Sequence, residues 1–433
     1  MRSWRGQHNL MAVSANTAET AINTEQTLDT TMLVAQGDVI NLEPKRESNA
    51  DEMTGYEEPD TVRDLGALAG ATLNFEKAQP QHFAFLLAYA LGAITTSAAG
   101  TGYSHLITPI SGDVDVSRSN PSFTAGMRFG NTILKRLFAS MFVDSVSASF
   151  PRDGWCKING TIKGTGKVSD NITEESITVT PGADPFACST SLTLASNAVE
   201  GATATERLQN VQRVRVLLAT GEWTDVAYTA VSAATPAVIT VEEINAVSVV
   251  DVTFKVLYIP TEAAWCTFPA RVTETPLRVT DLTVKLGGKY TAAAGYEVGR
   301  EFACEVESID YSIQNNLQPE MCVGGSGSYA DRCFRDGRAQ TLKFNREFRD
   351  YILQQHIDDN DTFAVQILAE GAVFDSPHMY TVGIYFPKVA VLSAPLSVNG
   401  KRLAEAGDFI VLEDSTEGSV SVTVKNIVAT YMA

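Results

Sequence analysis

The amino-acid sequence predicts a mainly β protein. We expect a β-sandwich or half-barrel core with one or two flanking helices, plus an inserted small β-sandwich of the immunoglobulin-like kind. Short runs rich in Val, Ile and Thr alternate apolar and polar residues along most of the chain, which is the two-residue period of half-buried strands. Apolar residues at helical spacing are scarce. A change of texture over residues 168–259, with few charges and five short strand-like runs, is typical of a small sandwich.

The domain boundaries follow from where these patterns change. The strand-like runs of the insert are 176–180, 191–194, 212–219, 237–241 and 248–258. Patterns like those before residue 168 resume at 277–286, so we expect one discontinuous core domain, 32–167 and 266–433, around an inserted domain, 168–265. Residues 1–31 are polar and lack periodicity, which indicates an arm that is disordered alone or ordered only against a partner.

The charge balance argues against several classes of protein. The 433 residues include 33 Lys and Arg against 51 Asp and Glu, a net charge of -18, whereas nucleic-acid affinity comes mainly from basic residues. The best apolar run, 83–93, is shorter than the roughly 20 residues of a membrane span, and no export signal is expected behind Arg2 and Arg5. The six cysteines are widely scattered, which favours free thiols in a reducing cytoplasm.

The stretch 305–353 contains two alternating strands. Along 305–314, Ile309, Tyr311 and Ile313 share one face, and Ser308, Asp310 and Ser312 share the other. The second strand, 339–345, repeats this alternation, with Thr341 and Lys343 on its polar face. From Asn345 to Leu353 the spacing predicts a one-sided surface helix, and the glycine-rich residues 315–337 predict a long functional or mobile loop.

A second hairpin with a polar face is expected between residues 143 and 163. Its polar residues are Ser147 and Ser149 on the first strand, and Lys157, Asn159, Thr161 and Lys163 on the second. Two such hairpins supply four strands, and alternation of polar and apolar residues is typical of a barrel wall with a wet inner side.

Three further elements are predicted from local signals. Pro80–Leu91 has an apolar stripe, a proline in its first turn and Gly92 at its end, so we expect a helix packed on its own sheet. A strand over 32–42 should end at Pro44 and lead into an acidic loop, 51–60. Asn399-Gly400 predicts a tight turn.

No pattern indicates catalysis, a cofactor or a metal. Residues 160–167 lack the spacing of a phosphate loop and have Val168 where Ser or Thr should hold magnesium. Residues 324–328 lack the last glycine of a nucleophile elbow, and 358–363 lacks the glycine and a ligand of a calcium loop. The five histidines are isolated in sequence. We therefore expect a protein that is not an enzyme.

The order of these features resembles the tail tube proteins of long-tailed bacteriophages, whose subunits stack as rings around a hollow core. The matching pieces are residues 34–39, the helix ending Tyr89-Ala90-Leu91-Gly92, and the Asp153-Gly154-Trp155 hairpin that leads to residues 164–167. The segment 309–317, with its glycine-rich sequel and residues 344–353, carries the likeness further. The resemblance covers roughly 32–167 and 266–433.

The resemblance implies a virion structural protein. Its hairpins would join those of neighbouring subunits into an inner barrel, commonly in a hexameric ring, assembled in the host cytoplasm around a tape-measure protein and beside neighbouring tail proteins. DNA would pass through without specific binding. The residues expected to face the lumen are Ser147, Ser149, Lys157, Asn159, Thr161, Lys163, Ser308, Asp310, Ser312, Thr341 and Lys343. Residues 315–337 would reach the next ring, and the inserted domain would project outward.

Two other classes remain open from the sequence. A tail terminator or a capsid decoration protein would share the β content and the acidity but would not form long tubes. A secreted carbohydrate-binding or hydrolytic protein would need an export signal, and a hydrolase would also need paired carboxylates or exposed aromatic rows.

Overall fold

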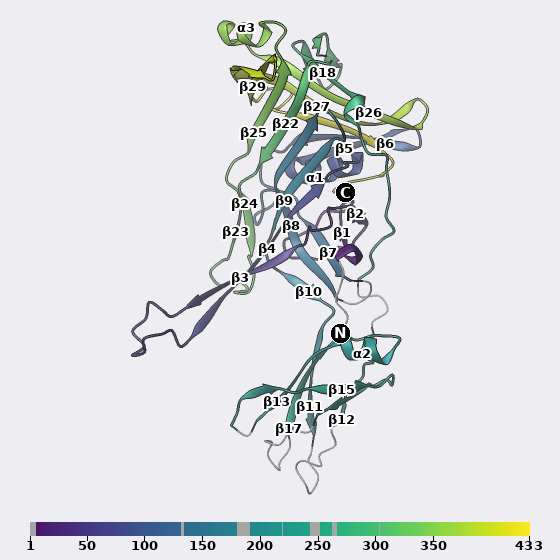
Figure 1. Cartoon of the computed structure of the whole chain (residues 1–433), viewed down its shortest axis with the longest axis vertical. Helices are drawn as coiled ribbons and strands as arrows, with labels where there is room; N and C mark the ends of the chain where they lie inside the picture. Colours follow the sequence, from purple (N-terminus) through teal and green to yellow (C-terminus); the bar gives the residue numbers. More distant parts are fainter. Residues whose placement is uncertain are drawn as a thin grey trace. The chain divides into compact units, whose positions relative to one another are not determined.

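The computed structural model describes residues 6–130, 134–179, 191–218, 220–242, 252–261, 266–302 and 304–433. The chain divides into two compact units. The small unit comprises Met1–Leu10, Met127–Arg136 and Ser169–Thr267, and the large unit comprises Met11–Gly126, Leu137–Val168 and Phe268–Ala433. Within the described ranges there are three α-helices and thirty strands, so the predicted mainly β fold is confirmed (Figure 1).

The first sheet of the large unit is antiparallel throughout. Its central strands, in spatial order, are β4 (Val62–Phe75), β9 (Lys157–Gly164), β8 (Leu134–Pro151), β22 (Val306–Gln314), β25 (Ala339–Glu347) and β29 (Arg402–Val411). β3 (Asn41–Ser48) lies beside β4 at one end, and β28 (Leu396–Asn399) lies beside β29 at the other. The two predicted hairpins are therefore neighbours, because β22 pairs directly with β8.

A second sheet covers the apolar side of the first. Its strands, in spatial order, are β21 (Arg300–Glu301), β18 (Leu282–Leu286), β26 (Phe363–Asp375), β27 (His378–Ser393), β30 (Ser421–Asn426), β6 (Gly102–Pro109) and β5 (Gly92–Ala99). The rings of Tyr311 and Phe386 meet edge to face across the two sheets at 4.9 Å. The end of β27 also pairs with β29, which joins the sheets along one side.

Helix α1 (Pro80–Leu91) is present as predicted, and it ends at Gly92, whose φ of 97° is left-handed. Every one of its residues is buried, so the helix is surrounded by protein on all sides and not only along the expected apolar stripe. Phe83 stacks on Phe150 of β8, and Leu86 lies so close to Gly160 of β9 that a Cβ there would approach its Cδ2 to 2.7 Å. The helix thus belongs to the core of the large unit.

A buried carboxylate holds the first turn of α1. Glu274 Oε2 accepts a hydrogen bond of 2.8 Å from the Gln81 N–H, and its Oε1 accepts one of 3.4 Å from the Ile427 N–H. Burial raises the pKa of Glu274 to about 7, against the lowering effect of these two bonds. Nearby, burial lowers the pKa of His82 to about 3, so this imidazole is neutral at physiological pH.

The prediction of a free N-terminal arm is wrong for most of its length, because this segment is folded against the large unit. β1 (Leu10–Val13) and β2 (Thr30–Met32) pair with each other, and the Glu19 side chain between them is buried. Its carboxylate accepts hydrogen bonds from the Ser122 and Thr124 hydroxyls, and from both the N–H and the hydroxyl of Ser140. Polar composition alone suggested disorder, but these partners, more than 100 residues away, give the segment a fixed place.

The predicted surface helix from Asn345 to Leu353 is wrong. β25 continues to Glu347, and α3 begins only at Ile352 and ends at Asp359. The reason is Arg346, which is fully buried and lies 2.7 Å from the buried Glu405 carboxylate. Sequence periodicity treats an arginine as solvent-facing, whereas this one is paired inside the protein.

The glycine-rich stretch is a folded hairpin and not the long loop that was predicted. β23 (Leu317–Glu320) pairs with β24 (Arg332–Arg335). The Asp331 carboxylate accepts from the Cys322 and Ser326 N–H groups, and the Ser328 carbonyl accepts from the Ala67 N–H. Val323, near the tip of this hairpin, is fully exposed.

The predicted end of a strand at Pro44 is also wrong. β3 runs through Pro44, which an outer strand tolerates because its missing N–H is on the unpaired side. The expected acidic loop is the far end of the β3–β4 hairpin, which extends away from the rest of the large unit (Figure 1). We call residues 43–65 the acidic hairpin.

The remaining short elements connect these layers. They are β7 (Phe123–Phe129), β10 (Val168–Asp170), β19 (Lys289–Thr291), β20 (Gly295–Glu297) and the 3-10 turns Gly6–His8 and Val279–Asp281. The predicted turn at Asn399-Gly400 is confirmed, since it joins β28 to β29 with Gly400 at a φ of 66°. We call residues 396–403 the basic hairpin, because it contains Lys401 and Arg402 and no acidic residue.

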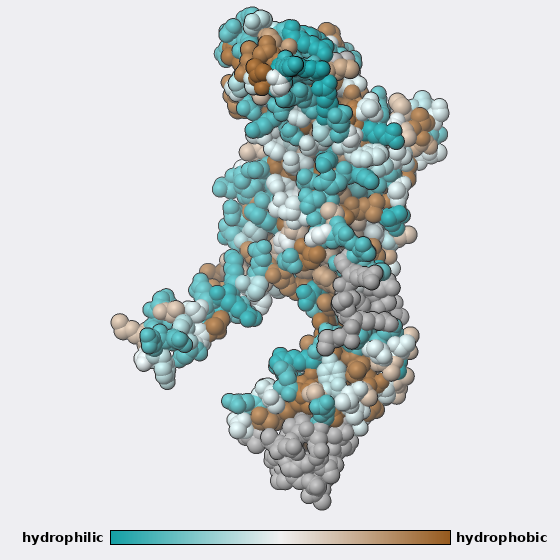
Figure 2. All heavy atoms as spheres, in the orientation of Figure 1, coloured by the Kyte–Doolittle hydropathy of each residue, from teal (hydrophilic) through white to brown (hydrophobic). Residues whose placement is uncertain are grey.

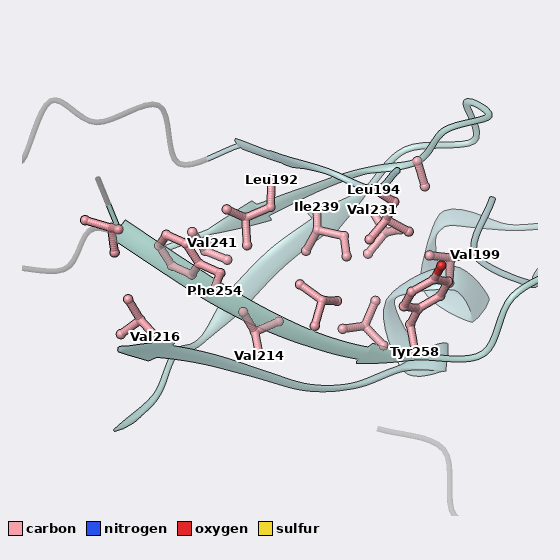
Figure 3. Packing of buried hydrophobic residues seen from close by; sticks show 14 residues of the cluster. Leu192, Leu194, Val199, Val214, Val216, Val231, Ile239, Val241, Phe254 and Tyr258 are labelled. Carbon is pink, nitrogen blue, oxygen red and sulfur yellow. The ribbon is translucent and has the colours of Figure 1, made fainter. Parts of the chain in front are cut away.

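The small unit is a two-layer β-sandwich. One sheet has the order β11 (Thr173–Val179), β17 (Val252–Tyr258), β13 (Val211–Leu217) and β14 (Trp223–Asp225); the other has β12 (Ser191–Thr193), β16 (Val238–Val241) and β15 (Tyr228–Val231). Leu192, Val214, Ile239 and Phe254 meet between the sheets in one core (Figure 3). The short helix α2 (Ala204–Asn210) was not predicted, and its Thr203 cap accepts from the Glu206 N–H. The expected insert, 168–265, falls almost wholly within this unit.

Candidate functional site

All eleven residues singled out from the sequence lie on four adjacent strands of the first sheet. The registers place Ser147 opposite Asn159 on one side and Ser312 on the other, and Ser312 opposite Thr341. Side chains directly opposite each other in a sheet point to the same face. These four residues therefore form one row across β9, β8, β22 and β25.

The next row contains charged residues. Lys157, Ser149, Asp310 and Lys343 are aligned across the same four strands, and the row continues to Asp408 on β29. The remaining candidates, Thr161, Lys163 and Ser308, extend the face along β9 and β22 by the same alternation. The structure thus brings the whole set together on one side of one sheet, which we call the polar face.

The two sides of this sheet differ sharply in burial. All eleven candidate side chains are exposed or partly exposed. The residues between them in sequence are buried, namely Val146, Ala148, Phe150, Ile158, Ile162, Ile309, Tyr311, Ile313, Leu342 and Phe344. The polar face is therefore accessible, while the other side packs on α1 and the second sheet.

The three lysines of the polar face each have an acidic neighbour. Lys157 Nζ lies 2.5 Å from Glu76, Lys163 Nζ lies 3.0 Å from Asp144, and Lys343 Nζ lies 3.6 Å from Asp408. These pairs are solvent-exposed, so they add little to stability. Their consequence is local neutralisation, because no lysine of the face stands as a free positive charge.

Hydroxyl groups supply most of the remaining surface. Ser149 Oγ donates to Asp310 Oδ1 at 2.5 Å, and the Ser312 and Thr341 hydroxyls are 2.6 Å apart. Asn345 Nδ2 donates to Ser308 Oγ at 2.9 Å. The face is thus a hydrogen-bonded layer of small polar groups rather than a set of convergent reactive side chains.

The polar face is wider than the sequence predicted. β4 adds Thr72 opposite Thr161 and Asn74 opposite Asn159, and β29 adds Asp408. In the sequence, the alternation of Gly70, Thr72 and Asn74 with apolar residues could have indicated that this strand contributes to the polar face. At this end the sheet borders an open groove of about 560 Å³, lined among others by Glu43, Lys45, Thr161, Lys163 and Gln318.

The other motifs considered in the sequence have structural positions. Residues 160–164, which partly resemble a phosphate loop, lie within β9. A strand and not a helix follows β9, so no helix N-terminus is placed to bind a phosphate. Among the described residues there is no group of three or more His, Cys, Asp or Glu that could hold a metal ion. None of the five described cysteines, Cys156, Cys266, Cys304, Cys322 and Cys333, is joined to another in a disulfide, and Cys188 lies outside the described residues.

None of the helices in the described part of the chain is long and apolar enough to cross a bilayer. No protein-family model matches the sequence, and no curated protein is significantly similar to it.

Proposed function

We propose that this protein is a tail tube subunit of a long-tailed bacteriophage, a virion component that polymerises into stacked rings around a conduit for DNA. The observation that carries the proposal is the polar face. Six central strands present one accessible polar side and one side buried against α1 and the second sheet. A wall of this kind suits a water-filled channel, because barrel walls around water alternate polar-in and apolar-out.

The chemistry of the face suits passage of DNA without adhesion. Phosphate binding depends on lysine and arginine releasing counterions from the duplex. Here Lys157, Lys163 and Lys343 already have acidic partners, and the chain carries a net charge of -18. A phosphate backbone would find hydroxyl and amide groups with little net positive charge.

Ring formation needs strand edges at which subunits join. The described part of the first sheet ends at β3 on one side and at β28 on the other, and both outer strands are mostly exposed. Two different ends on one subunit allow head-to-tail contacts, which close into rings or propagate as helices. The hexameric ring, the tape-measure protein, neighbouring tail proteins and assembly in the host cytoplasm belong to this proposal through the family resemblance.

A tail terminator or a capsid decoration protein is the alternative function. Both would use the same β architecture without forming long polymers.

The small unit has its own core, so deleting residues 169–261 should leave tube assembly intact if this unit is peripheral to the tube.

Negative-stain electron microscopy of the purified full-length protein at several concentrations is the first test. We expect hollow tubes or stacked rings. Persistent monomers or single small rings, unchanged by a tape-measure partner, would refute the tube and favour the alternative.

Cysteine labelling tests whether the polar face lines the lumen. In a background in which Cys188, Cys304 and Cys322 are serine, Ser147→Cys places a thiol on the face and Ser176→Cys places one at an exposed position of β11 in the small unit. Assembly should slow labelling of Ser147→Cys by a bulky polymer maleimide at least about tenfold and leave Ser176→Cys unchanged. Equal labelling of both sites in assembled tubes would place the face elsewhere.

A further inference from the structure

The acidic hairpin is an exposed surface with a strongly negative charge. Residues 43–65 include eight acidic and three basic residues. Four apolar side chains, Met53, Tyr56, Val62 and Leu65, are exposed by 44% or more. Figure 2 shows the hairpin as a largely hydrophilic projection from the large unit with a few apolar atoms near its tip.

Side-chain and backbone contacts join the two sides of the acidic hairpin just before its tip. Asn49 is buried, and its Nδ2 donates to Asp60 Oδ1 at 2.6 Å while its N–H donates to the Thr61 carbonyl. Arg63 and Glu52 pair across the hairpin at 3.1 Å. Contacts already formed within the hairpin reduce the conformational entropy that it would lose on binding.

The basic hairpin combines positive charge with exposed apolar side chains, although its Arg402 is already paired with Glu347 of β25. Lys401 is exposed at its turn, and the apolar side chains of Leu396, Val398 and Leu403 are exposed by 47%, 71% and 50%. In Figure 2 hydrophobic atoms gather near β29 and α3, at the upper end of the view. An apolar cluster with a basic turn is unusual on a chain with 18 excess acidic charges.

We propose that the acidic hairpin of one copy docks on the basic hairpin of a second copy. This inference rests on the proposed function and names the contact between subunits. Both hairpins extend outer strands at opposite ends of the first sheet, β3 and β28, so each copy offers both surfaces. Such a contact is heterologous, and it repeats from copy to copy without a second kind of interface.

The chemistry favours a second copy over other occupants. The acidic hairpin would repel nucleic acid and anionic membranes. Exposed apolar residues on both hairpins provide area to bury, and opposite charges set the orientation and the association rate. Exposed outer strands invite strand pairing, and the charges and Pro44 on β3 restrict it to a matching partner.

Disulfide cross-linking tests the contact directly. Ser48→Cys lies on the acidic hairpin and Ser397→Cys on β28, and both changes nearly conserve side-chain volume. The two variants, in a background with Cys188, Cys304 and Cys322 replaced by serine and one copy enlarged by a fusion, are mixed and oxidised. We expect a mixed dimer at a yield at least about tenfold above that of Ser48→Cys mixed with Ser176→Cys.

A charge reversal provides the second arm. Lys401→Glu should raise the concentration needed for cross-linking or assembly about tenfold, since like charges now face each other. Lys289→Glu, at the exposed first residue of β19, is the matched control and should have no such effect. Equal effects of the two reversals, or equal cross-linking of the control cysteine pair, would overturn the docking proposal.

The outcomes separate the two proposals. Tubes of the wild-type protein without the Ser48–Ser397 cross-link would refute this contact and leave the tube function standing. The cross-link without rings or tubes at any concentration would support the contact and refute the tube function.

Discussion

Replacement of Glu274 by Gln should remove a large part of the pH dependence of stability in the large unit. Glu274 is 1% exposed and receives two backbone hydrogen bonds at the start of α1 and after β30. Its pKa is about 7 in the folded protein, against an ordinary value of 4.5, and burial is the main cause. Glutamine keeps the shape of the side chain but does not titrate.

The sign of the effect follows from proton binding. Above about pH 4.5 the unfolded chain releases the Glu274 proton, whereas the folded protein keeps it until about pH 7. The contribution of Glu274 is therefore fully present below pH 4.5 and is lost as the pH rises to 7. A difference of roughly 2.5 pKa units corresponds to about 3 kcal/mol at 1.36 kcal/mol per unit.

His82 acts in the opposite direction and makes a comparison necessary. Its pKa of about 3 in the folded state, against the usual 6.5, means that stability falls as the pH drops below 6.5. This contribution is the same in the wild-type protein and in Glu274→Gln. The difference between the two proteins at two pH values therefore isolates Glu274.

The assay is urea unfolding followed by circular dichroism at about pH 4.5 and about pH 8. Relative to Glu274→Gln, the wild-type protein should lose about 3 kcal/mol of unfolding free energy between these conditions. Any fixed cost of the amide cancels in this difference. A pH dependence that is the same in both proteins would refute the buried, protonated carboxylate.

Two further predictions concern backbone and charge in the large unit. Gly166→Ala should lower the unfolding free energy by about 2 kcal/mol or more, because Gly166 has a φ of 91° and a Cβ there would lie 2.0 Å from the Ala67 carbonyl oxygen. Its control is Gly112→Ala, because there is open space around Gly112. In the same urea titration, this control should change the unfolding free energy by less than about 0.5 kcal/mol. Arg346→Ala should cost about 3–5 kcal/mol because it leaves the buried Glu405 unpaired. Arg332→Ala, which removes an exposed pair, should cost less than about 1 kcal/mol, and equal losses would contradict the assigned burial.

The alternation of the strands made the polar face predictable. A two-residue period fixes which side chains share a side of a strand, and Ile309, Tyr311 and Ile313 are buried as expected. Which strands become neighbours is not contained in that period. The pairing of β22 with β8, and the extension of the face to β4 and β29, needed the structure.

The errors have a common physical origin in polar groups with distant partners. Arg346 and Glu19 look solvent-facing in sequence, yet each is buried among groups supplied by other parts of the chain. The glycine-rich stretch looked mobile, but its Ser328 carbonyl accepts a hydrogen bond from the distant Ala67 N–H. Local patterns carry no information on such long-range compensation.

The pairing of β8 with β22 bears on when the first sheet can form during synthesis of the chain. Ser149 and Asp310, which meet at this joint, are 161 residues apart in sequence. Non-local strand pairing is slow, and it cannot begin until the ribosome has synthesised both partners. The outer strand β3 is made early and β28 late, so a nascent chain holds only one of the two ends of the first sheet. Under the proposed tube function, an incomplete chain would therefore lack one of the two ends that polymer growth needs.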